Sequence, residues 1–101
     1  MAESPESQAI LDDFYSFLEA GGSPLGIQTS LWAPDGRIGE HLFRLTGKRD
    51  MVLYVKVRSE PPPFWGLTAN RLDLLRGSSK AWAVVLLFER HSYGFVFKPA
   101  Y

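Results

Sequence analysis

The chain has 101 residues, of which 46% are hydrophobic and 14% aromatic, enough apolar material for one domain with its own core. It contains no cysteine, which excludes disulfides, thiolate zinc sites and cysteine nucleophiles and fits a reducing compartment. Eleven basic and eleven acidic residues give zero formal net charge, so attraction to nucleic acid would need a local cationic patch.

The N-terminal residues predict a cytoplasmic protein without a membrane partner. Glu3 and Glu6 are acidic at positions where a secretion signal carries basic residues. The longest uncharged apolar run, residues 81–88, is far shorter than the roughly 20 residues that cross a bilayer. We therefore expect a soluble protein.

The first element is predicted to be an amphipathic helix over residues 5–20. Ser4 is a good N-cap, and Pro5 is well placed at the first helical position because its missing N–H is not needed there. The apolar residues then follow one helical stripe, formed by Ile10, Leu11, Phe14, Phe17 and Leu18. Two glycines, Gly21 and Gly22, are expected to end the helix.

Three strands are expected next, at residues 27–32, 37–45 and 51–57. The first alternates apolar and polar residues, and the turn at 33–36 is built from proline, aspartate and glycine. The second is less regular, because it contains a glycine and its residues 40–43 also suit a helix. The third is an unbroken apolar run that predicts burial on both faces.

A second helix and two further strands complete the predicted order. Three prolines at 61–63 cannot donate to a ladder and must end the third strand. Thr68 caps a helix that Gly77 ends and that presents Leu72 and Leu75 on its apolar face. The remaining strands are expected at residues 81–88 and 93–98, with a polar turn at 89–92 between them.

These elements predict a single domain over residues 1–101 of the mixed α/β (α+β) class, in the order α-β-β-β-α-β-β. Short turns should make the first three strands an antiparallel meander, and the second helix should set strand 81–88 parallel to strand 51–57. Helices then flank a mixed sheet. Ligands commonly bind at the carboxyl ends of strands in such sheets, which selects Lys56 to Glu60 as the candidate site.

A cationic cluster is the first candidate feature at that strand end. If strands 37–45 and 51–57 form a hairpin in which paired residue numbers sum to about 95, Arg37 faces Arg58 and Gly39 faces Lys56. His41 would lie next on the same face. These cations would form an anion site suited to phosphate, or they are simply solvated side chains at the open end of the sheet. A slip of one residue moves the set to the other face.

Aromatic residues near the proline loop are the second candidate feature. Phe64 and Trp65, with Trp32, have the chemistry to stack on bases, although the alternative is that they cover the open end of the core. Arg71 and Arg76 on the polar side of the second helix would add phosphate contacts or remain solvated.

The second half of the chain resembles the PD-(D/E)xK nuclease superfamily, the restriction-endonuclease-like fold, and looks nearest to small Holliday-junction resolvase-like nuclease domains. The resemblance covers about half of the chain well and the rest only by element order. The segments that carry it are Lys56-Val57-Arg58-Ser59, Phe64-Trp65-Gly66-Leu67-Thr68, Leu72 to Leu75, Ala81 to Phe88 and Gly94-Phe95-Val96-Phe97. It implies a restriction-endonuclease-like core, but a fold does not by itself imply a function.

The active-site motif of that superfamily is degenerate in this chain. Members of the family bind a divalent metal through carboxylates and use a lysine at the strand end to position or activate water. Aligning Lys56 with the family lysine puts Tyr54 at the position of the metal-binding glutamate. Aligning Arg58 with that lysine instead puts Lys56 at the glutamate position. One metal carboxylate is missing in either alignment.

Displaced acids are the remaining way to complete a metal site. Asp35 follows a proline where the family has its Pro-Asp pair, although turn chemistry explains this pair better. Glu40 and Glu60 are the other candidates for a migrated carboxylate.

Three hypotheses for the function follow. The first is a degenerate nuclease-fold domain, without a metal or other cofactor, that binds DNA, RNA or a nucleic-acid-processing complex through Arg37, Lys56, Arg58, Trp65 and Arg71. The second is an active endonuclease that requires Mg²⁺ and uses Asp35, Glu40 and Lys56. The third is a small non-enzymatic interaction protein or inhibitor that uses an open sheet edge and an exposed aromatic patch to bind a protein partner or a second copy.

Overall fold

The computed structural model describes residues 4–33, 41–62, 65–67, 69–78 and 80–99. Its elements in chain order are α1 (Pro5–Gly22), the short 3-10 helix η1 (Ser23–Leu25), β1 (Gln28–Leu31), β2 (Leu42–Thr46), β3 (Asp50–Arg58), α2 (Ala69–Arg76), β4 (Ala81–Phe88) and β5 (Arg90–Phe97). This is the predicted order of helices and strands, and β4 has the predicted bounds.

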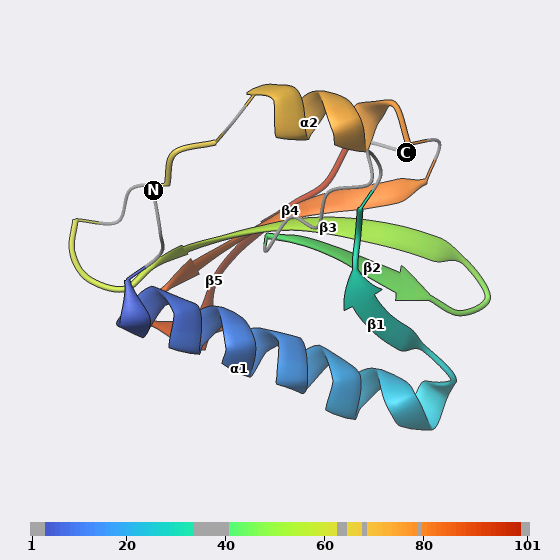
Figure 1. Cartoon of the computed structure of the whole chain (residues 1–101), viewed down its shortest axis with the longest axis horizontal. Coiled ribbons are helices and arrows are strands. Elements are labelled where there is room, and N and C mark those ends of the chain that lie inside the picture. The colour runs from blue at the N-terminus through green and yellow to red at the C-terminus, as the bar shows by residue number, and fades with distance from the viewer. Residues whose placement is uncertain (1–3, 34–40, 63–64, 68, 79, 100–101) are drawn as a thin grey trace.

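The strands form one mixed sheet in the order β1-β2-β3-β4-β5. Strands β3 and β4 are parallel, and the other neighbouring pairs are antiparallel. Helix α1 covers one face of the sheet and α2 the other, as Figure 1 shows. The predicted α+β class, the antiparallel meander and the parallel crossover are all confirmed.

Helix α1 begins as predicted but ends later. The Ser4 hydroxyl accepts a hydrogen bond from the Ser7 N–H at 3.1 Å, and Pro5 occupies the first turn. The helix runs through Gly22 and continues into η1 instead of ending at the glycine pair. Gly26 terminates it, because this residue adopts a positive φ of 74° that side chains with a Cβ rarely adopt.

Two apolar cores lie on the two faces of the sheet, and β3 contributes to both because successive strand residues point to opposite sides. Leu53 and Val55 pack beneath α1, whereas Val52 and Tyr54 pack beneath α2. All four are buried, which confirms the predicted burial of this strand on both faces. Leu75 anchors α2 in the second core and is fully buried.

The pairing of β2 with β3 differs from the predicted register by one residue. Paired residue numbers sum to 96, as in Leu42 with Tyr54 and Thr46 with Asp50. The reason is that three residues, 47–49, connect the strands, whereas the predicted sum of 95 requires a connection with an even number of residues. Strand β2 also begins at Leu42, and the predicted strand residues 37–40 lie outside the described residues.

The last strand begins earlier than predicted. The chain turns at Glu89, whose φ is 66°, and β5 starts directly afterwards at Arg90. The predicted polar turn over residues 89–92 is therefore wrong. A bulge lies beside this turn, because Leu87 pairs with Gly94 while Phe88 pairs with Arg90. Residues 94–97 then pair regularly with β4.

Tyr15 connects α1 to the sheet and gives the fold a testable pH dependence. Its hydroxyl donates to the Thr29 carbonyl at 3.0 Å, and burial together with the Glu19 charge raises the pKa of Tyr15 above 10.0. The folded state therefore holds this proton more tightly than the unfolded state. The resulting stabilisation is complete below about pH 10 and is lost as the pH rises further.

We predict that Tyr15→Phe lowers the free energy of unfolding by about 1 kcal/mol near neutral pH, because one hydrogen bond is lost. We also predict a shallower decline of stability above about pH 10 than in the wild type. Urea unfolding across this pH range measures both effects. An unchanged alkaline decline in the variant would contradict the assigned role of Tyr15.

Candidate functional site

The predicted strand-end cations lie together on β3. Lys56 and Arg58 follow Tyr54 at intervals of two residues along the strand, so both project from the α2 face, as Tyr54 does. Both are half-buried. The Arg58 Nε group donates to the carbonyl oxygens of Glu60, at 2.9 Å, and Pro62, at 3.1 Å. The side chain of Arg58 is thus held against residues 60–62 by hydrogen bonds to their backbone carbonyls.

The rest of the predicted anion cluster is only partly visible. His41 lies opposite Val55 because the pairing sum is 96, and it therefore does not share the Lys56 face as predicted. Its Nδ1 lies 2.8 Å from the Val55 carbonyl and must donate to it, because a carbonyl oxygen only accepts. Arg37, the third predicted cation, lies outside the described residues.

The predicted catalytic acids Asp35 and Glu40 also lie outside the described residues. Among the residues that the structure describes, no three His, Asp or Glu side chains are grouped so that they could hold a metal ion. Glu60 is exposed, and its backbone carbonyl, not its carboxylate, is the atom that contacts Arg58.

Trp65, the predicted stacking residue, packs within the protein. Its indole Nε1 donates to the Leu87 carbonyl at 2.9 Å, and its ring meets Phe88 and Phe95 edge-on at centroid distances of 6.2 Å each. Trp32 is buried in the core beneath α2. These contacts favour the alternative in which the tryptophans close the core. Phe64 lies outside the described residues.

The two arginines of α2 differ in their exposure. Arg71 is half-buried, whereas the exposed Arg76 is 3.4 Å from Asp73 one helical turn away. An exposed pair of this kind contributes at most about 1 kcal/mol.

A cluster of three charged side chains at the opposite end of β3 was not predicted. The Asp50 carboxylate lies 2.9 Å from the Arg44 guanidinium and 3.8 Å from the Lys80 ammonium. Arg44 is in β2, Asp50 is the first residue of β3, and Lys80 directly precedes β4. The cluster therefore connects β2 to the starts of the two parallel strands. Its single carboxylate is already shared by two cations, which indicates a structural role.

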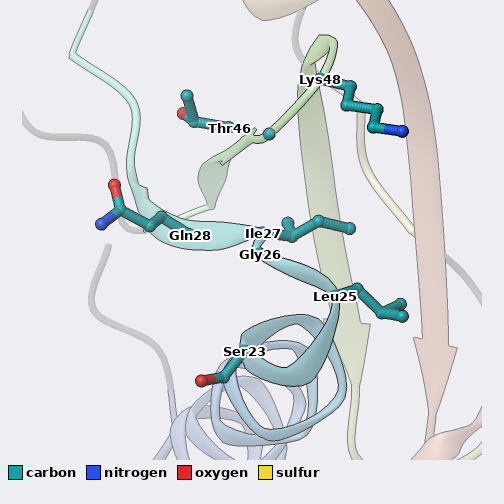
Figure 2. Close-up of a pocket in the computed structure, with 8 residues that line it drawn as sticks. Ser23, Leu25, Gly26, Ile27, Gln28, Thr46 and Lys48 are labelled. Atoms are coloured by element: carbon teal, nitrogen blue, oxygen red, sulfur yellow. The ribbon is translucent and has the colours of Figure 1, made fainter.

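A wide, shallow cavity lies between the end of α1 and the β2–β3 connection. It is lined by Ser23, Leu25, Gly26, Ile27, Gln28, Thr46, Gly47 and Lys48. Figure 2 shows that the polar ends of Ser23, Gln28 and Lys48 point in different directions and do not converge. The lining holds one cation and no carboxylate, so this cavity offers no arrangement for acid-base or metal chemistry.

The most unusual surface is the outer strand β5. Tyr93, Phe95 and Phe97 are 51%, 53% and 56% exposed, and Val96 is 66% exposed. Phe95 and Phe97 lie on the α2 face, because their partners Leu86 and Val84 belong to the core beneath α2. We call the outer edge of β5 with these four exposed side chains the β5 surface.

An apolar groove adjoins the β5 surface on the α2 face. Its volume is about 440 Å³, and its lining is almost wholly apolar because α2 covers only part of this face. It is formed by Leu67, Leu72, Trp82, Val84, Leu86 and Phe97, with Lys98 and Pro99 beside them. We call it the α2 groove.

The β5 surface is also a sheet edge. Edge strands present unpaired N–H and C=O groups and are normally protected by charged residues, prolines or bulges. Residues 94–97 contain no charge and no proline, and the bulge lies to one side of them. The other edge, β1, has only four residues.

The sequence-based hypothesis of an interaction protein included an open sheet edge but did not say which strand forms it. The available signal was the alternation of Tyr93, Phe95 and Phe97.

No family model, curated protein or solved structure matches this chain. The PD-(D/E)xK resemblance therefore stays a prediction, whereas the α+β class rests on the sheet and its two helices. None of the helices in the described ranges is long and apolar enough to cross a membrane.

Proposed function

We propose that this chain is a small non-enzymatic interaction protein that binds another protein chain at the β5 surface. The observation that supports this proposal most strongly is the exposure of four large apolar side chains on one edge strand, of which residues 94–97 carry no charge. An aromatic side chain has an area of roughly 150–250 Å², so Tyr93, Phe95 and Phe97 leave on the order of 300 Å² of aromatic surface in water. Exposed apolar area of this order on a small protein often marks a binding site.

Strand addition is the binding mode that this surface supports best. An extended partner segment would hydrogen-bond to the outer backbone groups of residues 94–97, which supplies affinity with little dependence on sequence. Alternate side chains of that segment would lie over Phe95 and Phe97 and reach the α2 groove, which supplies specificity. Lys98 at the edge of the groove would favour a partner with an acidic group nearby.

The test uses affinity capture followed by titration with the purified partner. Val96→Lys places a charge in the exposed centre of the β5 surface, and Leu31→Lys places one on the opposite edge strand, where Leu31 is 42% exposed. We expect a protein retained by the wild type and by Leu31→Lys to bind Val96→Lys at least about tenfold more weakly.

Equal binding to all three proteins would show that the partner uses another surface. Failure of the wild type to bind any protein, including a second copy of itself, would overturn the proposed function.

Binding of nucleic acid by a degenerate nuclease-fold domain remains a second proposal. The observation that favours it is the placement of Lys56 and Arg58 on one face at the carboxyl end of β3. We expect Lys56→Glu with Arg58→Gln to weaken binding to single-stranded, duplex or junction DNA about tenfold or more at low salt, because phosphate contacts are electrostatic. Lys48→Glu, in the connection at the other end of β3, is the control.

Electrophoretic binding assays measure this effect, and no binding of the wild type to any of these DNAs would reject the proposal. The endonuclease hypothesis has its own test. Cleavage that requires Mg²⁺ and disappears in Lys56→Ala would support it, and absence of such cleavage would reject it.

A further inference from the structure

We infer that the partner at the β5 surface is a second copy of this chain, bound through antiparallel pairing of β5 with the partner subunit's β5. The inference rests on the proposed function and specifies the partner. Antiparallel pairing of two identical edge strands produces a two-fold axis, and the same residues then serve both subunits. The two sheets would join into one continuous sheet.

The regular part of β5 sets the register of this pairing. The bulge removes residues 91–93 from the regular ladder, whereas 94–97 pair regularly with β4 and Lys98 follows them. The centre of the segment 94–98 is Val96, so the two-fold axis passes beside Val96. Val96 then lies opposite Val96 of the partner subunit, and Phe95 lies opposite Phe97 of the partner subunit.

Charge supports the same register. An axis at Gly94 would place Arg90 opposite Lys98 of the partner subunit, and like charges at directly opposed positions are destabilising. With the axis at Val96, Lys98 lies opposite Gly94 of the partner subunit and Arg90 lies beyond the paired segment. The zero formal charge of the whole chain means that two copies do not repel each other at long range.

The exposed area is a large part of what a stable dimer needs. The exposed side chains of the paired segment, Phe95, Val96 and Phe97, amount to on the order of 300 Å² of apolar area per subunit, given their exposed fractions of 53–66%. Each partner of a standard interface buries about 800 Å², of which a little over half is non-polar. These three side chains thus supply more than half of the non-polar share.

The aromatic residues also complement each other across the axis. Phe95 and Phe97 lie on the α2 face with their ring centroids 6.4 Å apart. Pairing at Val96 would place two such rings from each subunit side by side on that face, as two facing pairs, with the α2 groove of each subunit beside them. Cross-strand aromatic pairs of this kind stabilise antiparallel strands.

A charge-swap experiment at the axis tests the inference. Sedimentation equilibrium of the wild type should show a dimer, whereas Val96→Lys or Val96→Glu alone should dissociate about tenfold more readily, because each removes an apolar pair and places two like charges opposite one another. An equimolar mixture of the two variants should dimerise again, because lysine then faces glutamate. Val96 is 66% exposed, so neither substitution disturbs the core.

The control is Leu31→Lys on β1, which should dimerise as the wild type does, and circular dichroism verifies that each variant is folded. A wild type that remains monomeric while capturing a different protein through β5 would overturn this inference and leave the proposed function standing. A dimer that survives Val96→Lys, or that Leu31→Lys disrupts, would overturn the β5 pairing. Failure of the mixture to associate would overturn the register.

Discussion

Gly94→Ala is expected to lower the free energy of unfolding by about 3 kcal/mol, a large fraction of the stability of a small domain. A Cβ atom at position 94 would overlap the backbone carbonyl of Leu86 on β4. The overlapping atoms belong to the sheet backbone, which cannot rotate away as a flexible side chain would. Strand β5 must therefore separate from β4 locally, and the β5 surface would be lost with it.

Urea unfolding and amide hydrogen exchange measure this effect. The matched control is Gly21→Ala, where an added Cβ meets nothing within 4 Å and alanine favours the helical conformation of α1. We expect Gly21→Ala to raise the free energy of unfolding by about 0.5–1 kcal/mol. A Gly94→Ala protein as stable as the wild type, with unchanged exchange in residues 94–97, would contradict the close approach of β5 to β4.

Leu75→Ala is expected to lower the free energy of unfolding by about 3 kcal/mol. Leu75 is fully buried, and it is the residue of α2 that is buried in the core beneath that helix. Removing its side chain leaves a void under a helix of eight residues, which has little stability of its own. Leu72 on the same helix lines the α2 groove, so loosening α2 would also distort the groove.

The control for this prediction is Arg76→Ala at the exposed end of α2, which should change stability by no more than about 0.5 kcal/mol. Thermal or urea unfolding distinguishes the two variants. Equal stability of Leu75→Ala and Arg76→Ala would mean that α2 does not pack on the sheet through Leu75.

The sequence was sufficient to predict the elements whose pattern is set by local chemistry. Ser4 and Pro5 specify a helix start, and the apolar runs of β3 and β4 specify strands buried on both faces. The order of elements then determines the meander and the parallel crossover.

The errors lie where one residue changes the outcome. A connection of two or three residues is compatible with the sequence around Gly47, yet it decides which face His41 occupies. The start of β5 was missed because Arg90, His91 and Ser92 resemble a turn, although polar residues are also common on an edge strand.

The candidate site was predicted in part. The pair of cations at the end of β3 is correctly located, since Lys56 and Arg58 follow the apolar run directly. The bonds from Arg58 to the loop carbonyls depend on the path of residues 60–62, and no local pattern specifies that path. The β5 surface was not located because alternating aromatic residues normally indicate a covered face. Their exposure depends on the place of β5 at the edge of the sheet and on the short length of α2.

Amide hydrogen exchange of the wild type at low and high protein concentration tests the central claim, that β5 pairs with a second copy of the chain, most directly. Pairing with a second copy would slow exchange in residues 94–97 as the concentration rises, while residues 28–31 of the opposite edge strand would exchange at an unchanged rate. Exchange in β5 that is independent of concentration would contradict self-association at that edge, and slower exchange in β1 alone would place the interface on the other side of the sheet.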